Sequence, residues 1–272
     1  MENNLCKLCG KGKPVDSHII PGFIFRWLKK SGTGRLRSIE DINIPKQDGR
    51  VIKLLCSNCE GLFNTAETYF ANNIFQPVVQ SSVVEFQYDH RLRYFLISLF
   101  WRTMKDYIDV EKTSWYNFLL NAEKEWSDYL LNGKPLQGFD EIHMIVGVDI
   151  IKDDDNFRMF MARAVDAGIP NSDDACLFYI KLPRFIILMP ISGFDLNFFE
   201  NSRIGENGLY NINNVSIKDP AIGQYFIERS QMFDQRFSSM SEKQKKSTRD
   251  LTKKKESDLL GNDLGRISRY KS

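Results

Sequence analysis

The stretch Leu54-Leu55-Cys56-Ser57-Asn58-Cys59-Glu60 contains two cysteines separated by two residues. The same spacing occurs near the N-terminus in Cys6-Lys7-Leu8-Cys9. Two thiolates separated by two residues can bind one tetrahedral metal ion, and two such pairs supply four ligands for a closed structural zinc site. The tripeptide Asp16-Ser17-His18 lies between the pairs. The spacing predicts a structural zinc ion on Cys6, Cys9, Cys56 and Cys59. The alternative is two unrelated pairs of buried thiols.

The residues around the cysteines predict two strands and a helix. Val15–Ile20 is rich in β-branched side chains and ends at Pro21, and Arg50–Leu55 is the second predicted strand. After Cys59, polar residues recur at helical spacing opposite an apolar stripe. We therefore expect a zinc-braced strand–strand–helix module over residues 1–80.

This order of motifs resembles the HNH, or ββα-metal, nuclease family. The matching stretches are Cys6–Cys9, Asp16-Ser17-His18-Ile19-Ile20-Pro21 and Leu54–Glu60, all within residues 1–75, and the last is similar to phage Holliday-junction resolvases of the endonuclease VII type. In the family, the histidine that ends the first strand is the general base, so the resemblance implies this role for His18. Its neutral imidazole would take a proton from water, which attacks phosphorus while a divalent cation neutralises charge on the phosphate.

The catalytic metal ligands depart from the family pattern. Asp or His usually precedes the base directly, but this chain has Ser17 there, and Asp16 would bind metal only if the backbone were irregular. The Asn often found before the second cysteine pair is missing, and Asp48-Gly49-Arg50-Val51 stands in its place. Glu60 matches the position of the last ligand, and a carboxylate suits Mg²⁺ or Mn²⁺. The resemblance implies a Mg²⁺ or Mn²⁺ site on Glu60, with Asp16 or Glu67 as a supplement.

These site residues also have structural interpretations. His18 could hydrogen-bond a loop without touching phosphate, and Glu60 could complement the dipole of its helix. His90 and His143 are single histidines in a helix-like and a strand-like segment, so we expect structural roles for them. Cys176 is expected to be a small buried apolar side chain.

The remainder of the chain predicts a mixed helical and antiparallel β domain over residues 81–240. Residues 85–132 have helical periodicity, and Asp219-Pro220 predicts the start of a C-terminal helix. An antiparallel sheet of three or more strands is predicted from segments rich in β-forming residues, namely 141–151, 159–164 and 177–191. Residues 241–272 are rich in Lys and Ser and predict a basic flexible tail. The expected fold class is α+β.

Composition describes an ordinary globular chain with an uneven charge distribution. Of its 272 residues, 42% are hydrophobic and 26% charged, and the net charge is +2. Residues 1–60 carry eleven Lys/Arg against six Asp/Glu, and residues 241–272 carry ten against five, so both ends are basic around an acidic middle. Basic ends suit a polyanionic partner, although solvated surfaces would look the same.

Several classes of protein are disfavoured by the sequence. There is no run of eighteen apolar residues, so we expect no membrane span, and the polar start Met1-Glu2-Asn3-Asn4 is not typical of a secretory signal. Closely spaced cysteine pairs are typical of metal binding in a reducing compartment. We therefore expect a cytoplasmic protein.

These observations lead to three functional hypotheses. The first is a metal-dependent endonuclease that cleaves nucleic acid, with DNA as the expected substrate. The second is a catalytically inactive, zinc-stabilised nucleic-acid-binding module in which Ser17 marks a lost metal site. The third is an effector subunit that a protein partner regulates through residues 80–240, by analogy with bacterial defence or mobile-element systems.

Overall fold

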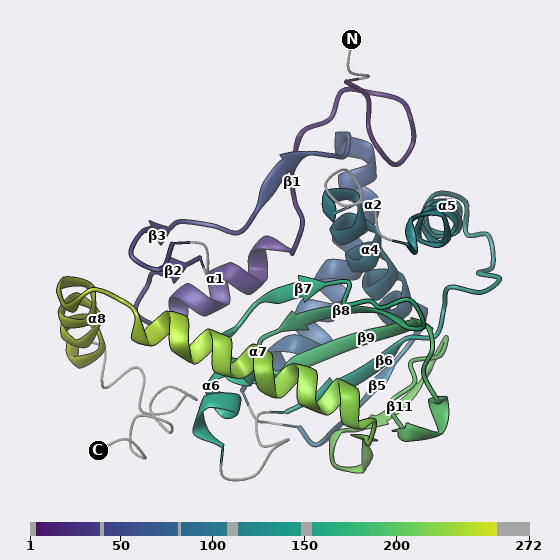
Figure 1. Ribbon diagram of the computed structural model, residues 1–272. Coiled ribbons are helices and arrows are strands. Elements are labelled where there is room, and N and C mark those ends of the chain that lie inside the picture. The colour runs from purple at the N-terminus through teal and green to yellow at the C-terminus, as the bar shows by residue number, and fades with distance from the viewer. Residues whose placement is uncertain (1–3, 39–40, 81–82, 108–113, 148–153, 255–272) are drawn as a thin grey trace.

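The computed structural model describes residues 4–38, 41–80, 83–107, 114–147 and 154–254, which form an α+β fold (Figure 1). The helices are α1 (Gly22–Lys30), α2 (Ser57–Phe70), the π-helix η1 (Ala71–Phe75), α3 (Gln76–Val79), α4 (His90–Tyr107), α5 (Tyr116–Asn132), α6 (Asp155–Arg163), α7 (Pro220–Ser238) and α8 (Glu242–Lys254), with short 3-10 turns η2 (Leu196–Phe198) and η3 (Ile212–Asn214). The strands are β1 (Asp16–His18), β2 (Leu36–Arg37), β3 (Pro45–Lys46), β4 (Val51–Lys53), β5 (Glu85–Tyr88), β6 (His143–Val146), β7 (Asp166–Gly168), β8 (Cys176–Leu182), β9 (Phe185–Ser192), β10 (Phe199–Glu200), β11 (Gly208–Asn211) and β12 (Ser216–Ile217).

The N-terminal segment has the predicted order of two strands followed by a helix. β1 pairs antiparallel with β4, so that Asp16 lies opposite Lys53 and His18 opposite Val51. α2 begins at Ser57, directly after the first cysteine of the second pair. The chain between β1 and β4 forms α1 and the small antiparallel pair β2–β3. Helix α1 and this pair therefore lie between the two strands in sequence.

The central sheet has the antiparallel order β6-β9-β8-β7. Alternate side chains of β8 enter two different apolar clusters, because successive residues of a strand point to opposite faces. Phe178 and Ile180 pack in the cluster that contains α4, whereas Leu177 and Tyr179 pack in the cluster that contains α6 and α7. Figure 1 accordingly shows α7 crossing one face of the sheet, with α2 and α4 behind it.

One apolar cluster connects the N-terminal module to the sheet. It includes the buried cysteines of the module, the inner faces of α2 and α4, and buried residues of β6, β8 and β9. Phe70 of α2 stacks on Phe95 of α4 with ring centroids 4.2 Å apart, and Phe70 also contacts Phe185 of β9. Helix α4 therefore packs against α2 and holds it in place.

None of the described helices combines the length and the apolarity that a membrane crossing requires.

The prediction of a strand at residues 159–164 was wrong, because residues 159–163 belong to α6. The carboxylate of Asp154 accepts a hydrogen bond from the N–H of Phe157 over 2.8 Å and caps the helix. Buried Phe157, Phe160 and Met161 then recur at spacings of three and four residues, which places them on one helical face. The helical period outweighs the β-forming tendency of individual residues here.

Three other expectations are modified. Residues 85–88 of the predicted helical region form β5, which pairs with β11, and the helices of that region are α4 and α5. A helix, α8, occupies residues 242–254 where a flexible tail is predicted, and residues 255–272 lie outside the described chain. The end of the predicted strand region 141–151 also lies outside the described chain. The prediction for α7 is confirmed, because this helix begins at Pro220 with Asp219 as its cap. The division into domains at residue 80 stays a prediction.

Candidate metal centre and histidine site

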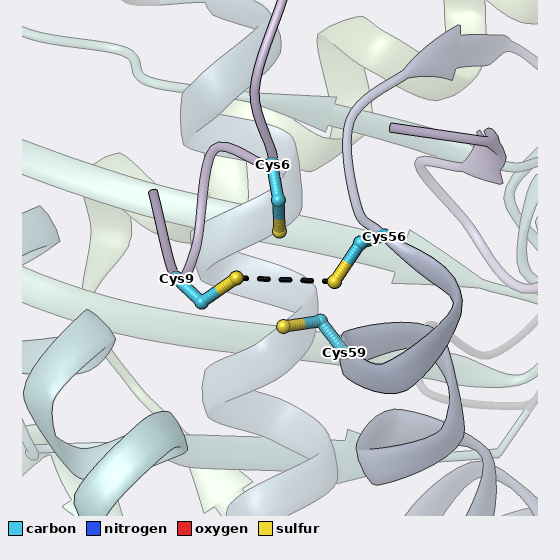
Figure 2. Close-up of side chains that lie close together, drawn as sticks. All are labelled: Cys6, Cys9, Cys56 and Cys59. Atoms are coloured by element: carbon cyan, nitrogen blue, oxygen red, sulfur yellow. Dashed lines mark hydrogen bonds between the residues drawn. The ribbon is translucent and has the colours of Figure 1, made fainter. Parts of the chain in front are cut away.

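The four cysteines of the two pairs meet at one point. Their Sγ atoms all lie within 4.8 Å of one another, and the Cys9 and Cys56 sulfurs are 3.8 Å apart. Figure 2 shows the four side chains converging, two from the N-terminal turn and two from the start of α2. Sulfurs at the corners of a tetrahedron around zinc, with Zn–S bonds of about 2.3 Å, are separated by about 3.8 Å. The donor set and its spacing therefore suit a structural zinc ion.

Backbone hydrogen bonds hold the two halves of this cluster together. The N–H of Lys7 donates to the carbonyl of Leu54 over 2.9 Å and joins the halves, and within the N-terminal turn the N–H of Cys6 donates to the carbonyl of Gly12 over 3.0 Å. Gly12 has φ of +68°, and a Cβ there would lie 3.1 Å from the Cβ of Cys56. Glycine is therefore favoured at this position, both for its left-handed backbone and for the close approach of the second pair.

Without a metal, the pKa values of the Cys6 and Cys59 thiols shift in opposite directions. Burial raises the pKa of the Cys6 thiol, but hydrogen bonds from the backbone of Cys9, Cys56 and Leu8 outweigh it and bring the pKa to about 7. Burial and then hydrogen bonds with the neighbouring cysteines raise the pKa of Cys59 well above its ordinary value. Four thiolates at this separation repel one another, and a divalent cation would remove that repulsion.

His18 forms a pair with a carboxylate that the sequence analysis assigned to no site. Its Nε2 lies 3.0 Å from Oδ2 of Asp48, in the loop that leads from β3 into β4. Burial alone would raise the pKa of Asp48, but the hydrogen bonds from His18 and from the Gly49 N–H hold that pKa below its ordinary value. An ionised Asp48 can only accept, so Nε2 must carry the donated proton. In neutral His18 the lone pair is then on Nδ1.

Helix α1 places further groups next to this pair. A Cβ built on Gly22 would lie 3.3 Å from the imidazole Nε2 and 3.2 Å from Nη1 of Arg26, so the ring and the guanidinium border the same glycine. A Cβ on Gly49 would meet the ring of Phe25, which packs directly on the backbone beside Asp48. Arg26 is exposed, and no sequence motif singled it out.

Ser17 does not point toward the His18–Asp48 pair. Its side chain is fully buried, and its Oγ accepts a hydrogen bond from the N–H of Leu55 over 3.1 Å. Because strand residues alternate between faces, it is Asp16 that shares the face of His18. Asp16 therefore lies on that face in a regular strand, and its role as a metal ligand stays a prediction. The carboxylate of Asp16 forms an exposed ion pair with Lys53 over 2.8 Å.

Glu60 and Glu67, on one face of α2, have different environments. The Oε1 atom of Glu60 is buried and has no hydrogen-bond partner within the described residues. Glu67 accepts from Nη1 of Arg102 over 2.7 Å, and the same nitrogen lies 3.3 Å from the carbonyl oxygen of His18. Arg102 is buried in α4 and so ties the end of β1 to α2. Glu67 is therefore engaged as an ion-pair partner.

The other histidines and the fifth cysteine lie elsewhere. His90 is exposed at the start of α4, and His143 is buried in β6, where its Nδ1 contacts Oγ of Ser202 at 2.8 Å. Cys176 is fully buried in β8, as expected. Throughout the part of the chain that the structure describes, the four-cysteine cluster is the one group of three or more metal-ligating side chains found close together.

The site thus brings together one predicted residue, His18, with two that the sequence analysis missed, Asp48 and Arg26. The sequence analysis named Asp48 only as the start of Asp48-Gly49-Arg50-Val51, because its approach to His18 depends on tertiary pairing across 30 residues. Comparisons of this chain with protein-family models, with curated proteins and with solved structures found no match.

Proposed function

We propose that this protein is a metal-dependent endonuclease of the HNH type, which hydrolyses phosphodiester bonds in nucleic acid, with DNA as the expected substrate. The observation that carries the proposal is the His18–Asp48 pair. His18 ends β1, β1 pairs with β4, and α2 follows β4 in the chain. The cysteine cluster lies at the opposite end of the same strand pair. This combination joins a candidate base to a braced strand–strand–helix scaffold.

Zinc on Cys6, Cys9, Cys56 and Cys59 is assigned a structural role. Four thiolate ligands leave no coordination position for water or substrate, and such closed sites stabilise folds. The ion would fix the N-terminal turn against the start of α2 and the end of β4. It would thereby set where β1, and with it His18, lies relative to α2.

His18 acts as general base in this proposal. Ionised Asp48 holds the Nε2–H tautomer, as a carboxylate does in other histidine-dependent hydrolases, and leaves the Nδ1 lone pair to take a proton from water. The neighbouring Arg26 carries a guanidinium, which suits two oxygens of a phosphate. We assign Arg26 to the binding of the scissile phosphate.

A catalytic Mg²⁺ or Mn²⁺ ion would be held by Asp16 and Glu60, the carboxylates to which the resemblance assigns it. Asp16 is on the same strand face, and Glu60 has a buried oxygen without a partner among the described side chains. Mg²⁺ commonly takes one or two carboxylates and fills its remaining positions with water and phosphate oxygens, so a sparse protein ligand set is compatible with it. When bound, the ion would neutralise charge on the phosphate and on the leaving oxygen.

The test is metal-dependent cleavage. Purified zinc-loaded protein is incubated with supercoiled plasmid, single-stranded DNA and RNA, each with Mg²⁺, Mn²⁺, Ca²⁺ or a chelator of divalent cations. The proposal predicts nicking of at least one nucleic acid with Mg²⁺ or Mn²⁺ and none with the chelator. Absence of cleavage with every substrate and metal, from protein that contains one zinc per chain, would contradict it.

A second candidate is a zinc-stabilised module that binds nucleic acid without cutting it. The observation in its favour is that Asp16 is already paired with Lys53, while no third acidic, histidine or cysteine ligand joins His18 and Asp48 within the described chain. This candidate predicts binding that weakens steeply with salt, because phosphate contacts release counterions, and no cleavage with any divalent metal.

A further inference from the structure

The two basic ends of the chain meet in the structure. Figure 1 shows α8 at the same end of the molecule as β2 and β3, which lie more than 190 residues earlier. The contact begins where the N–H of Ser241 donates to Oδ1 of Asn43 over 2.9 Å. It follows that the C-terminal helix adds its charges to those of the N-terminal module.

Arginines of the β2 region anchor α8 through neutral acceptors. Arg37 donates to Oε1 of Gln244 over 2.9 Å and to the carbonyl of Ile42 over 2.7 Å, and Arg35 donates to Oγ of Ser247 over 3.0 Å. Among the described residues, neither arginine forms an ion pair with a carboxylate. Their positive charges are therefore fixed in place, without a neutralising carboxylate in the part of the chain that the structure describes.

The opposite face of α8 carries lysines toward solvent. Lys243 and Lys246 are three residues apart, so they lie on one side of the helix, and both are exposed. In the described part of the chain neither has a carboxylate partner, whereas Lys245 is paired with Glu242. We call Arg35, Arg37, Lys243 and Lys246 the basic surface.

The part of the basic surface that contains Arg35 and Arg37 is close to the His18–Asp48 pair along the chain. Leu36 lies opposite Lys46 in the β2–β3 pair, and Lys46 is two residues before Asp48. Two residues span at most about 7 Å and paired strands are about 5 Å apart, so the Cα atoms of Leu36 and Asp48 are separated by no more than about 13 Å. Lys29 of α1 adds a hydrogen bond to the carbonyl of Gln47 over 2.7 Å, which holds this connection.

We propose that the basic surface binds the sugar–phosphate backbone of the nucleic acid whose scissile bond lies at His18. The proposal rests on the function proposed above and adds where the substrate is held. Helix α8 has 13 residues, and at 1.5 Å per residue this corresponds to about 20 Å, or about six base steps of duplex. Lysines on one helical face and unneutralised arginines contact phosphates without reading sequence. The surface therefore gives affinity and position rather than base specificity.

The test compares two charge-matched double variants of the full-length protein. Lys243→Ala with Lys246→Ala removes two charges from the basic surface, and Lys124→Ala with Lys134→Ala removes two exposed charges around α5. Binding to a labelled 20-base-pair duplex is measured with Ca²⁺ in place of Mg²⁺, at several NaCl concentrations. Loss of two phosphate contacts should reduce the slope of log K against log salt by about 1.8, and weaken binding about tenfold at low salt.

Binding and cleavage are scored separately so that the two proposals can fail independently. If the Lys243/Lys246 variant shows the reduced salt slope but wild type does not cut with Mg²⁺ or Mn²⁺, the basic surface stands and the nuclease proposal fails. If wild type cuts, but the α8 variant matches both wild type and the α5 control in slope and affinity, the basic surface is contradicted. Competition by polyglutamate as strong as by duplex, at equal charge, would also overturn it in favour of an acidic protein partner.

Discussion

The hydroxyl of Ser17 accepts a hydrogen bond from the backbone N–H of Leu55 over 3.1 Å, inside the core between β1 and α2. In the sequence, this serine stands where the HNH family, which the N-terminal motifs resemble, places a metal ligand. In the structure, it connects the first strand to the chain just before Cys56, and Asp16 occupies the outer face instead. An acid at position 17 would therefore be buried, and Asp16 is the acid on the face of His18.

Ser17→Asp should destabilise the protein rather than create activity. The substitution buries a carboxylate in an apolar core, which we expect to cost about 2–4 kcal/mol in the free energy of unfolding. Ser17→Ala, the control, removes one acceptor and should cost about 1–2 kcal/mol. Urea denaturation of both variants measures the difference. A stable Ser17→Asp protein that cuts DNA faster than wild type would instead support a decayed metal site.

Asp48→Asn should slow cleavage without unfolding the protein. The amide keeps the shape but loses the charge that orients His18, and comparable losses of an orienting or basic group cost about 10²–10⁴ in rate. Asp41→Asn, on the same exposed loop, is the matched control and should cut like wild type. Single-turnover nicking rates at saturating metal give the comparison. Equal rates for the two variants would exclude Asp48 from the site.

Arg102→Met should destabilise the fold because it leaves the Glu67 carboxylate without its ion-pair partner. Glu67 is only 19% exposed, and loss of one partner of such a pair costs about 3–5 kcal/mol. In a double-mutant cycle, adding Glu67→Gln should restore part of that loss, since the unpaired charge is then gone. Additive losses in urea denaturation would show that the two side chains do not interact.

Acid should destabilise the protein in part through His143. Burial, and then the charge of Arg203, lower its pKa to about 4, whereas an unfolded histidine titrates near about 6.5. Between about pH 6.5 and about pH 4, His143 is therefore protonated in the unfolded chain but neutral in the folded one. The contribution of neutral His143 to the free energy of unfolding is complete above about pH 6.5 and is lost as pH falls toward 4. His143→Gln should show a shallower fall in unfolding free energy from pH 7 to 5 than wild type. Parallel pH profiles would contradict the assignment.

Removal of the metal should unfold the N-terminal module. Cys9→Ala should reduce zinc to well below one ion per chain and lower the thermal midpoint, because binding of a structural zinc ion contributes to folding. Cys176→Ala, which alters a buried cysteine of β8, should keep one zinc per chain. Zinc content by elemental analysis and circular dichroism after chelation measure both effects. Full stability of zinc-free wild type would contradict a structural role.

Local sequence signals predicted the N-terminal strands, helix α2, the cysteine cluster and the start of α7. These features depend on spacing and on capping residues such as Asp219, which act over a few positions. Of the segments predicted wrongly, α6 has a local cap and a helical period that the β-rich interpretation of its residues overlooked. The start of α8 instead depends on contacts with distant parts of the chain. Arg37, for example, holds Gln244 from 207 residues away.

The same distinction separates the predicted site residues from those that were missed. His18 was identified by its place between the cysteine pairs, but Asp48 reaches it only after β1 has paired with β4. Arg26 borders the same glycine as the imidazole because α1 begins at Gly22, shortly after β1 ends at His18. The assignment of His18 as base, a protein partner for residues 80–240 and a cytoplasmic location stay predictions.

The most direct test of the central claim is plasmid nicking by wild type and His18→Ala, prepared with equal zinc content. With Mg²⁺ or Mn²⁺, wild type should convert supercoiled plasmid to the open form, and the variant should be slower by about 10²-fold or more, because no other group replaces the base. Equal nicking by the two proteins would contradict the account, and would show that His18 is not the catalytic base.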